Sequence, residues 1–353
     1  MKLRTRSAGA FLLLAGVSAC DIPTSMPRWE TTWITPSEET SVSVVELLPA
    51  GLSVNNDTSA FVLTIDPVND AFALSEFCGG ACPPVTATVP KPAFSGTVST
   101  VAPIPAAIQS AEIEGGTIDI ELVNGFDFDP LRPGVNADSG SISITIRSGN
   151  ALVASAMVDG GNQALPPGAT LALELDFVPS TLTGDLSVEL TLVSPAGDVT
   201  TLNPNDALGI TIQSDGVLVS EAVVALSGQS IEGVETELDL EDVDLEDRIN
   251  GGSIFLDIEN PFGATGNLSL LFDFPSGADI VKPVALAAGS STVQVDFTEA
   301  EIERLIGETT TMVISGTVNG GNVTIQPDME IVIGARLRLV VEVGGEADDE
   351  GGN

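Results

Sequence analysis

GGTIDIELVNGF at residues 115–126 and GGSIFLDIENPF at residues 251–262 are two versions of one stretch. They align without a gap and share the glycine pair, an isoleucine, an asparagine (Asn124 and Asn260) and a phenylalanine (Phe126 and Phe262). Three more blocks match in the same order: 139–146 with 265–272, 164–177 with 285–297, and 201–212 with 324–335. Four ordered matches predict a tandem duplication.

The pattern within each copy predicts strands. Between 331 and 343 every second residue is apolar, while Arg336, Arg338 and Glu342 lie between them. A period of two with one polar face is typical of an antiparallel strand that is buried on one side. Hydrophobic residues make up 43% of the chain but aromatic residues only 4%, so aliphatic side chains must form the core. We therefore predict an all-β chain with tandem antiparallel β-sandwiches at 106–228 and 248–343.

The second copy resembles a known family. It has Asn260-Pro261 in an early strand, a helix predicted at 299–307 and ISGTVNGGNVTIQP at 314–327. This order is similar to the late embryogenesis abundant type 2 domain, also called the water stress and hypersensitive response domain. The resemblance implies an immunoglobulin-like or fibronectin type III-like sandwich without catalytic residues, in a family associated with stress protection and with membrane-tethered chains. The first copy departs from the pattern, so its membership rests on the repeat.

The predicted helix carries its own start signal. In TEAEIERLIGE (298–308), Thr298 can accept a bond from the amide three residues on, and Glu301 can return one, which is a capping box.

The amino terminus predicts an anchor. A basic start is followed by the apolar run GAFLLLAGVSA (9–19), which is too short to cross a bilayer as a helix. VSAC at 17–20 resembles the bacterial lipobox, which implies that 1–19 is a signal peptide and that Cys20 is lipidated. We predict a lipoprotein of the bacterial cell envelope, periplasmic or surface-exposed, that is held by this anchor. The outer membrane is favoured over the inner one, although Asp21 resembles a signal for inner-membrane retention.

Two segments precede the repeats. Residues 20–41 are rich in Pro, Ser and Thr, as expected of a tether. They contain Trp29 and Trp33, which either pin the tether to the folded body or lie in lipid headgroups or on a partner. Residues 42–105 alternate strand-like runs with turn residues, which predicts a small β segment, either an independent cap or edge strands for the first repeat.

Cys78 and Cys82 have a C-x3-C spacing within 42–105. A translocated chain reaches an oxidising compartment, so we expect them to form a disulfide. A metal site would need more ligands nearby, and the chain has no histidine.

Acidic residues outnumber basic ones 50 to 12, and the net charge of −38 repels nucleic acid. In the first copy, Asp127, Asp129, Asn136 and Asp138 lie in a turn-rich insertion whose oxygen ligands suit Ca²⁺, although an ordinary solvated loop is the preferred interpretation in a chain this acidic. No other cofactor is expected. Residues 229–247 are predicted as an acidic linker or edge strand, and 344–353 as a disordered tail.

The sequence excludes several chemistries. Without histidine there is no Ser-His-Asp or Cys-His arrangement, and neither a P-loop nor G-x-S-x-G occurs. We therefore expect a non-enzymatic binding or structural module that contacts an envelope protein, a glycan or a lipid. The alternatives are a carrier of an apolar or lipid ligand, which needs a large apolar cavity, and a hydrolase that uses two carboxylates.

Overall fold

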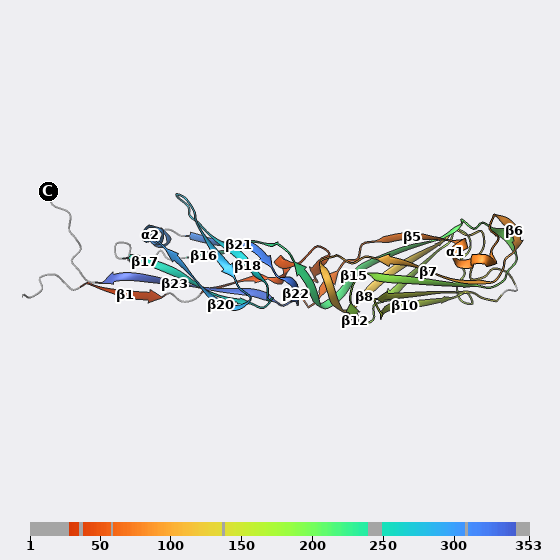
Figure 1. Cartoon of the computed structure of the whole chain (residues 1–353), viewed down its shortest axis with the longest axis horizontal. Helices are drawn as coiled ribbons and strands as arrows, with labels where there is room; N and C mark the ends of the chain where they lie inside the picture. Colours follow the sequence, from red (N-terminus) through yellow and green to blue (C-terminus); the bar gives the residue numbers. More distant parts are fainter. Residues whose placement is uncertain are drawn as a thin grey trace, which may run out of the picture.

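The computed structural model describes residues 28–34, 38–57, 59–135, 138–238, 249–307 and 310–343. The predicted signal peptide, Cys20 and the predicted tail at 344–353 lie outside these residues. The described chain is mostly β and forms an elongated body (Figure 1). Its antiparallel strands build two sandwiches that lie end to end.

Sandwich 1 consists of two sheets. Sheet 1a contains β10 (Ala151–Asp159), β9 (Ser141–Ser148), β13 (Leu186–Ser194) and β7 (Phe94–Ala102), in that order. Sheet 1b contains β11 (Thr170–Asp176), β8 (Ile108–Asn124), β15 (Ala207–Leu226) and β5 (Val68–Ala73). At one end, β6 (Ala87–Pro90) pairs with β14 (Val199–Leu202).

Sandwich 2 repeats this plan. Sheet 2a contains β19 (Ile280–Leu286), β18 (Thr265–Asp273), β21 (Thr310–Asn319) and β16 (Gln229–Leu238). Sheet 2b contains β20 (Gly289–Phe297), β17 (Ile249–Asn260) and β23 (Glu330–Val343), with β1 (Trp29–Ile34) and β2 (Glu38–Ser43) both on the free edge of β23. The strand order is therefore the same in both bodies, and β7 holds the place in the first that β16 holds in the second. The repeating unit thus extends beyond the sequence boundaries at 106 and 248 to include these strands.

Alternation explains the layers. In β13, residues 186, 188, 190, 192 and 194 are buried, and the residues between them are exposed or half-buried. The inward-facing residues of both sandwiches belong to one continuous apolar cluster, built mainly from Ile, Leu and Val. The prediction of antiparallel, half-buried strands with an aliphatic core is confirmed.

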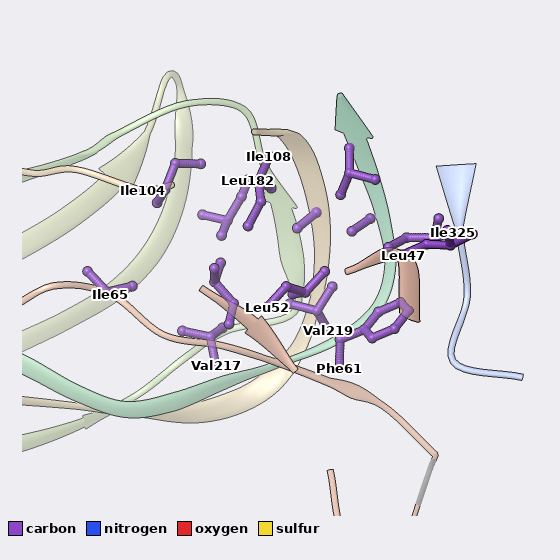
Figure 2. Packing of buried hydrophobic residues seen from close by; sticks show 14 of the residues in the cluster. Leu47, Leu52, Phe61, Ile65, Ile104, Ile108, Leu182, Val217, Val219 and Ile325 are labelled. Carbon is purple, nitrogen blue, oxygen red and sulfur yellow. The ribbon is translucent and has the colours of Figure 1, made fainter. Parts of the chain in front are cut away.

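The two sandwiches share strands at their junction. β15 is 20 residues long and extends past sandwich 1, where it pairs with β22 (Gly321–Ile325) of the second repeat. β12 (Ser180–Leu182), β4 (Phe61–Leu63), β3 (Leu52–Val54) and the 3-10 helix η1 (Val44–Leu47) complete this region. Figure 2 shows its buried side chains, among them Phe61 and Val219.

Polar bonds also cross the junction. Gly320 N donates to Leu226 O (3.1 Å), Val44 N donates to Met329 O (3.0 Å), and the Gln326 amide donates to the Glu221 carboxylate (2.8 Å). Backbone pairing, a shared core and side-chain bonds together make the two repeats one continuous body.

Gly116 accounts for part of the duplicated glycine pair. It has φ of 111° and pairs with Val217, between two shifts in the register of β8 and β15; Gly216, the residue before Val217, has φ of 130°. A Cβ on Gly116 would lie 2.6 Å from Gly216 O. Only glycine fits this backbone and this approach, which lets the two long strands continue from sandwich 1 into the junction.

The segment before the repeats runs along both sandwiches. β1 and β2 pair with β23, η1, β3 and β4 lie at the junction, and β5 pairs with β15 in sandwich 1. The prediction of a tether is therefore wrong for residues 29–34 and 38–41, which are strands of sheet 2b. The described residues of 42–105 form no separate sheet, and their strands join the edges and ends of the two sandwiches, as the edge-strand alternative predicted.

The predicted helix is present as α2 (Glu299–Gly307). Thr298 N donates to Glu301 Oε2 (2.8 Å) and Glu301 N donates to Thr298 Oγ1 (3.4 Å), so the predicted capping box is confirmed. Of the acidic stretch at 229–247, residues 229–238 form the edge strand β16, and the remainder lies outside the described residues. No helix within the described ranges is long and apolar enough to cross a membrane.

Candidate functional site

The tip is the end of sandwich 1 that lies farthest from sandwich 2 (Figure 1). Its described loops are 79–86, 125–135, 138–140, 160–168, 195–198 and 203–206. α1 (Leu74–Cys78), the 3-10 helix η2 (Gly79–Ala81) and β6 lie there (Figure 1). The tip also holds the described residues that the sequence singled out, namely Cys78, Cys82, Asp127, Asp129 and Asp138. Asn136 lies outside the described residues.

Asn124 fixes the largest loop of the tip. Its buried amide donates to Phe128 O (2.9 Å) and Leu165 O (2.7 Å), and its Oδ1 accepts from Phe126 N (2.9 Å). Asn260 makes the same three kinds of bond in sandwich 2, to Ala264 O, Ala287 O and Phe262 N. The duplicated asparagine therefore has a structural role in both repeats, because each one satisfies three buried backbone groups.

Asp129 is also occupied by the backbone. One carboxylate oxygen accepts from Leu131 N (2.8 Å) and Arg132 N (3.0 Å), and the other accepts from Leu165 N (3.0 Å). Arg132 in turn donates to Gly160 O and Gly161 O. Asp129 thus holds the insertion against the 160–168 loop, which is a different use of its oxygens from the predicted cation site.

The other described acids of the predicted cation site, Asp127 and Asp138, have different surroundings. Burial raises the pKa of Asp206, and the negative charge of Asp127 raises it further. A hydrogen bond from the Asn203 amide lowers this pKa, but the net shift is upward. Asp138 is exposed. In the part of the chain that the structure describes, no three carboxylates or thiols form a group that could hold a metal ion.

Cys78 and Cys82 form the predicted disulfide, with their Cα atoms 5.6 Å apart. The bond closes α1 and η2 into a compact cap on the tip. Phe77 of α1 contacts Phe72 and Phe126 edge-to-face, at 6.4 Å between ring centroids in both cases. Gly96 of β7 permits this packing, because a Cβ there would lie 2.2 Å from Phe77 O.

Lys91 lies beneath the tip and is only 1% exposed. Its ammonium group donates to Pro92 O (3.0 Å) and Pro195 O, and it lies over the rings of Phe94 and Phe128, 4.6 and 5.3 Å from their centroids. No carboxylate within the described ranges forms an ion pair with it. Burial without an anion lowers the pKa of Lys91 to about 8.

Lys91 makes the stability of the protein depend on pH in a simple way. An unfolded lysine has a pKa of about 10.4, so between about pH 8 and 10.4 the unfolded chain binds a proton that the folded chain has released. Folding is therefore penalised most below pH 8, and stability rises with pH through this range. From pH 7 to 9.5 the free energy of unfolding is expected to increase by about 2 kcal/mol.

The measurement is urea unfolding at pH 7, 8, 9 and 9.5. Because the chain has no His or Tyr, few other groups titrate in this range, and Lys91→Met shares all of them. We expect the rise to disappear in Lys91→Met. An equal rise in both proteins would contradict the assignment.

The surface of the tip is apolar and acidic. Val85, Val135 and Val199 are 68%, 93% and 64% exposed. Val135 lies on the loop after β8 and Val199 begins β14; these segments are adjacent, because Asp198 N donates to Pro133 O. A shallow hollow of about 590 Å³ lies beside the disulfide; its lining includes Gly79, Gly80, Cys82, Pro83, Pro84 and Pro204. Hydrogen-bonded loops that present exposed valines form a preorganised surface for a partner.

The end of sandwich 2 that corresponds to the tip is covered, because it pairs with sandwich 1 at the junction. β22 in the second repeat corresponds to β14 in the first, and β22 pairs with β15 across the junction, whereas β14 pairs with β6. The two sandwiches therefore have the same orientation along the body. At the tip, β6 pairs with β14, and at the junction the end of β15 pairs with the corresponding strand β22. The segment 74–92 thus acts as an end cap for the tandem array.

The sequence did not predict that Asp129 binds backbone amides of two loops, and it did not single out Lys91. A signal existed for both: Asp129 precedes Pro130, a pair that favours turn initiation, and Lys91 is one of only three lysines in the chain and lies between two prolines.

No protein-family model matches the chain, and no curated protein matches it. Among solved structures, it is similar to a protein inferred to be secreted, from Parabacteroides distasonis, at 9% identity over 88% of this chain and 99% of that one, with a TM-score of 0.32. It is also similar to infectious bursal disease virus strain Gx (12% identity, 82% and 78% covered, TM-score 0.20). A third is the CBM22-1-CBM22-2 tandem domain of Paenibacillus barcinonensis Xyn10C (12%, 87% and 98%, 0.18). At such scores these likenesses carry no inference about function.

Proposed function

We propose that the chain is a lipoprotein of the bacterial cell envelope, anchored through Cys20, whose tandem domains act as a non-enzymatic binding module with the tip as its contact surface. One observation carries the proposal: the first described strand, β1, lies at the end of the body opposite the tip (Figure 1). An anchor eight residues before Arg28 therefore holds sandwich 2 near the membrane and presents the tip away from it.

The composition of the tip supports a protein partner. Carbohydrate sites commonly offer aromatic platforms, and the chain has no tyrosine and no tryptophan beyond Trp29 and Trp33, which lie in β1 at the other end. The exposed valines of the tip lie beside Asp127, Asp198 and Asp206. A complementary partner would therefore be a protein whose own surface has an apolar centre surrounded by cationic side chains.

Three hollows bear on the alternative of an apolar-ligand carrier. Those of about 360, 370 and 590 Å³ are shallow, and charged side chains, or the glycines and prolines of the tip, contribute to their linings. None is the enclosed apolar cavity that a carrier needs. This favours the binding module over the carrier.

The finer fold assignment is part of the proposal. We infer that both repeats are immunoglobulin-like or fibronectin type III-like sandwiches related to the late embryogenesis abundant type 2 domain. The shared roles of Asn124 and Asn260 support a common origin of the two repeats.

The anchor is tested by labelling cells that express the full chain with a palmitate analogue. Wild-type protein is expected to incorporate label, and Cys20→Ser is expected to lose it completely, because the acyl chains attach at this thiol. Ser18→Ala is the matched control in the same stretch and is expected to retain the label. Persistent labelling of Cys20→Ser would overturn the proposal.

A further inference from the structure

β1 exposes large apolar side chains on both of its faces. Trp29 and Trp33 are 54% and 52% exposed, and Ile34 is 62% exposed. The two indoles lie opposite Val343 and Leu339, on the side of sheet 2b that faces sheet 2a, while Ile34 lies on the outer side opposite Arg338. Large apolar side chains exposed together on one strand indicate a surface that binds a protein or a membrane.

The equivalent strand of sandwich 1 does not share this feature. By the repeat alignment, β1 corresponds to β4, which pairs with Val217–Val219 of β15, and Phe61 and Leu63 of β4 are fully buried at the junction. The exposed aromatic residues are therefore specific to the sandwich on which the anchor would act.

The charges beside β1 also differ from those of the rest of the chain. Twelve basic residues, three of which precede Cys20, leave nine for the folded protein, and Arg28, Arg336 and Arg338 are three of these. Arg28 pairs with Glu342 (3.3 Å) and Arg336 pairs with Asp257 (2.8 Å), so these carboxylates are neutralised. Beside β1, the three arginines equal Glu30, Glu342 and Asp257 in number, so this part of the outer face carries less net negative charge than the protein as a whole.

A shallow groove of about 370 Å³ runs across this face. It is lined by Thr32, Ile34, Phe255, Arg336 and Arg338. The matching positions of sandwich 1 are acidic: Asp119 corresponds to Phe255 in the duplicated stretch, and Asp119, Glu121 and Glu174 line the hollow there. Apolar side chains with guanidinium groups at their border suit the headgroup layer of a membrane, where guanidinium binds phosphate.

The length of chain before β1 limits where this face can lie. Arg28 comes only eight residues after Cys20, and an extended chain spans at most about 3.5 Å per residue, so Arg28, directly before β1, stays within about 28 Å of the anchored cysteine. This step rests on the proposed function.

We propose that sheet 2b docks edge-on, through its edge strand β1, into the headgroup layer of a phosphatidylethanolamine-rich membrane. The docking surface, called the β1 face, comprises Trp29 and Trp33 from the inner side of this edge and Ile34, Arg28, Arg336 and Arg338 from its outer side. The indoles and Ile34 enter the interface, and the arginines contact lipid phosphates. Such a contact is weak alone and becomes effective when the anchor raises its local concentration.

Trp29 and Trp33 are the only tryptophans and the chain has no tyrosine, so intrinsic emission reports on β1 alone. The probe is residues 20–353 with Cys20 coupled through a maleimide to phosphatidylethanolamine, in vesicles of phosphatidylethanolamine and phosphatidylcholine. With brominated acyl chains in these vesicles, we expect a roughly twofold loss of emission and a shift to shorter wavelength, because interfacial indoles lie near the bromines. The same protein with Cys20 blocked and not coupled should show little change.

Two variants sharpen the test. Ile34→Ser combined with Arg338→Gln removes exposed groups of the β1 face and is expected to abolish most of the quenching. Val199→Ser combined with Arg147→Gln makes a matched change on sandwich 1 and is expected to leave it intact. Unchanged emission in the coupled protein would overturn the proposal, and so would an emission change that depends on protein concentration without lipid, which would assign the face to a second copy of the chain.

Chemical coupling separates this test from the proposed function. A failure of palmitate labelling in cells leaves the vesicle result standing, and a failure of quenching leaves the lipidation of Cys20 standing.

Discussion

Asn124→Ala is expected to lower the free energy of unfolding by about 3 kcal/mol, because it leaves Phe128 O, Leu165 O and Phe126 N buried without partners. Asn124→Asp should be at least as damaging, since it places a carboxylate against two carbonyl oxygens. Asn260→Ala is expected to cost a similar amount, because the bonds are equivalent.

Denaturant unfolding with two probes tests this prediction. Circular dichroism reports on all strands, whereas tryptophan emission reports on sheet 2b, at the other end of the molecule from Asn124. If the repeats unfold as one unit, Asn124→Ala shifts both transitions together. Asn150→Ala, on an exposed turn, is the matched control and should change stability by less than about 0.5 kcal/mol. A shift in circular dichroism alone would show that the sandwiches unfold separately.

Phe61→Ala is expected to cost about 4 kcal/mol, because Phe61 is fully buried in the junction core (Figure 2). Loss of this ring leaves a cavity between the segment that precedes the repeats and β15, which carries sandwich 1 into the junction. The effect should therefore be larger than that of a residue that serves one sandwich alone.

The measurement is again unfolding followed by both probes, and the transition is expected to split, because the connection between the sandwiches is weakened while each core stays intact. Val45→Ala, 52% exposed on η1, is the matched control. A single unchanged transition in Phe61→Ala would contradict the role assigned to the junction.

The sequence predicted local features well. The duplication, the capping box at Thr298 and Glu301 and the disulfide between Cys78 and Cys82 all depend on residues close together or on a direct comparison of two stretches. The alternation in 331–343 predicted a half-buried strand for the same reason, because period two is a local property.

The sequence did not reveal the long-range pairings. WETTWI at 29–34 forms a strand because β23 lies about 300 residues away to receive it, and strand formation depends on such partners more than on intrinsic preference. Among 50 acidic residues, composition also could not separate a carboxylate that caps backbone amides, such as Asp129, from one that is free to bind a cation.

The path of residues 28–73 has a mechanical consequence. This segment begins at the end of the body opposite the tip, pairs with β23 and then with β15, and ends directly before α1 at the tip. A pull between an anchored amino terminus and a partner on the tip would run along these strands, and ladder hydrogen bonds are perpendicular to the strands. The bonds would resist together in shear instead of opening one after another, so the segment can serve as a tensile tie along the length of the protein.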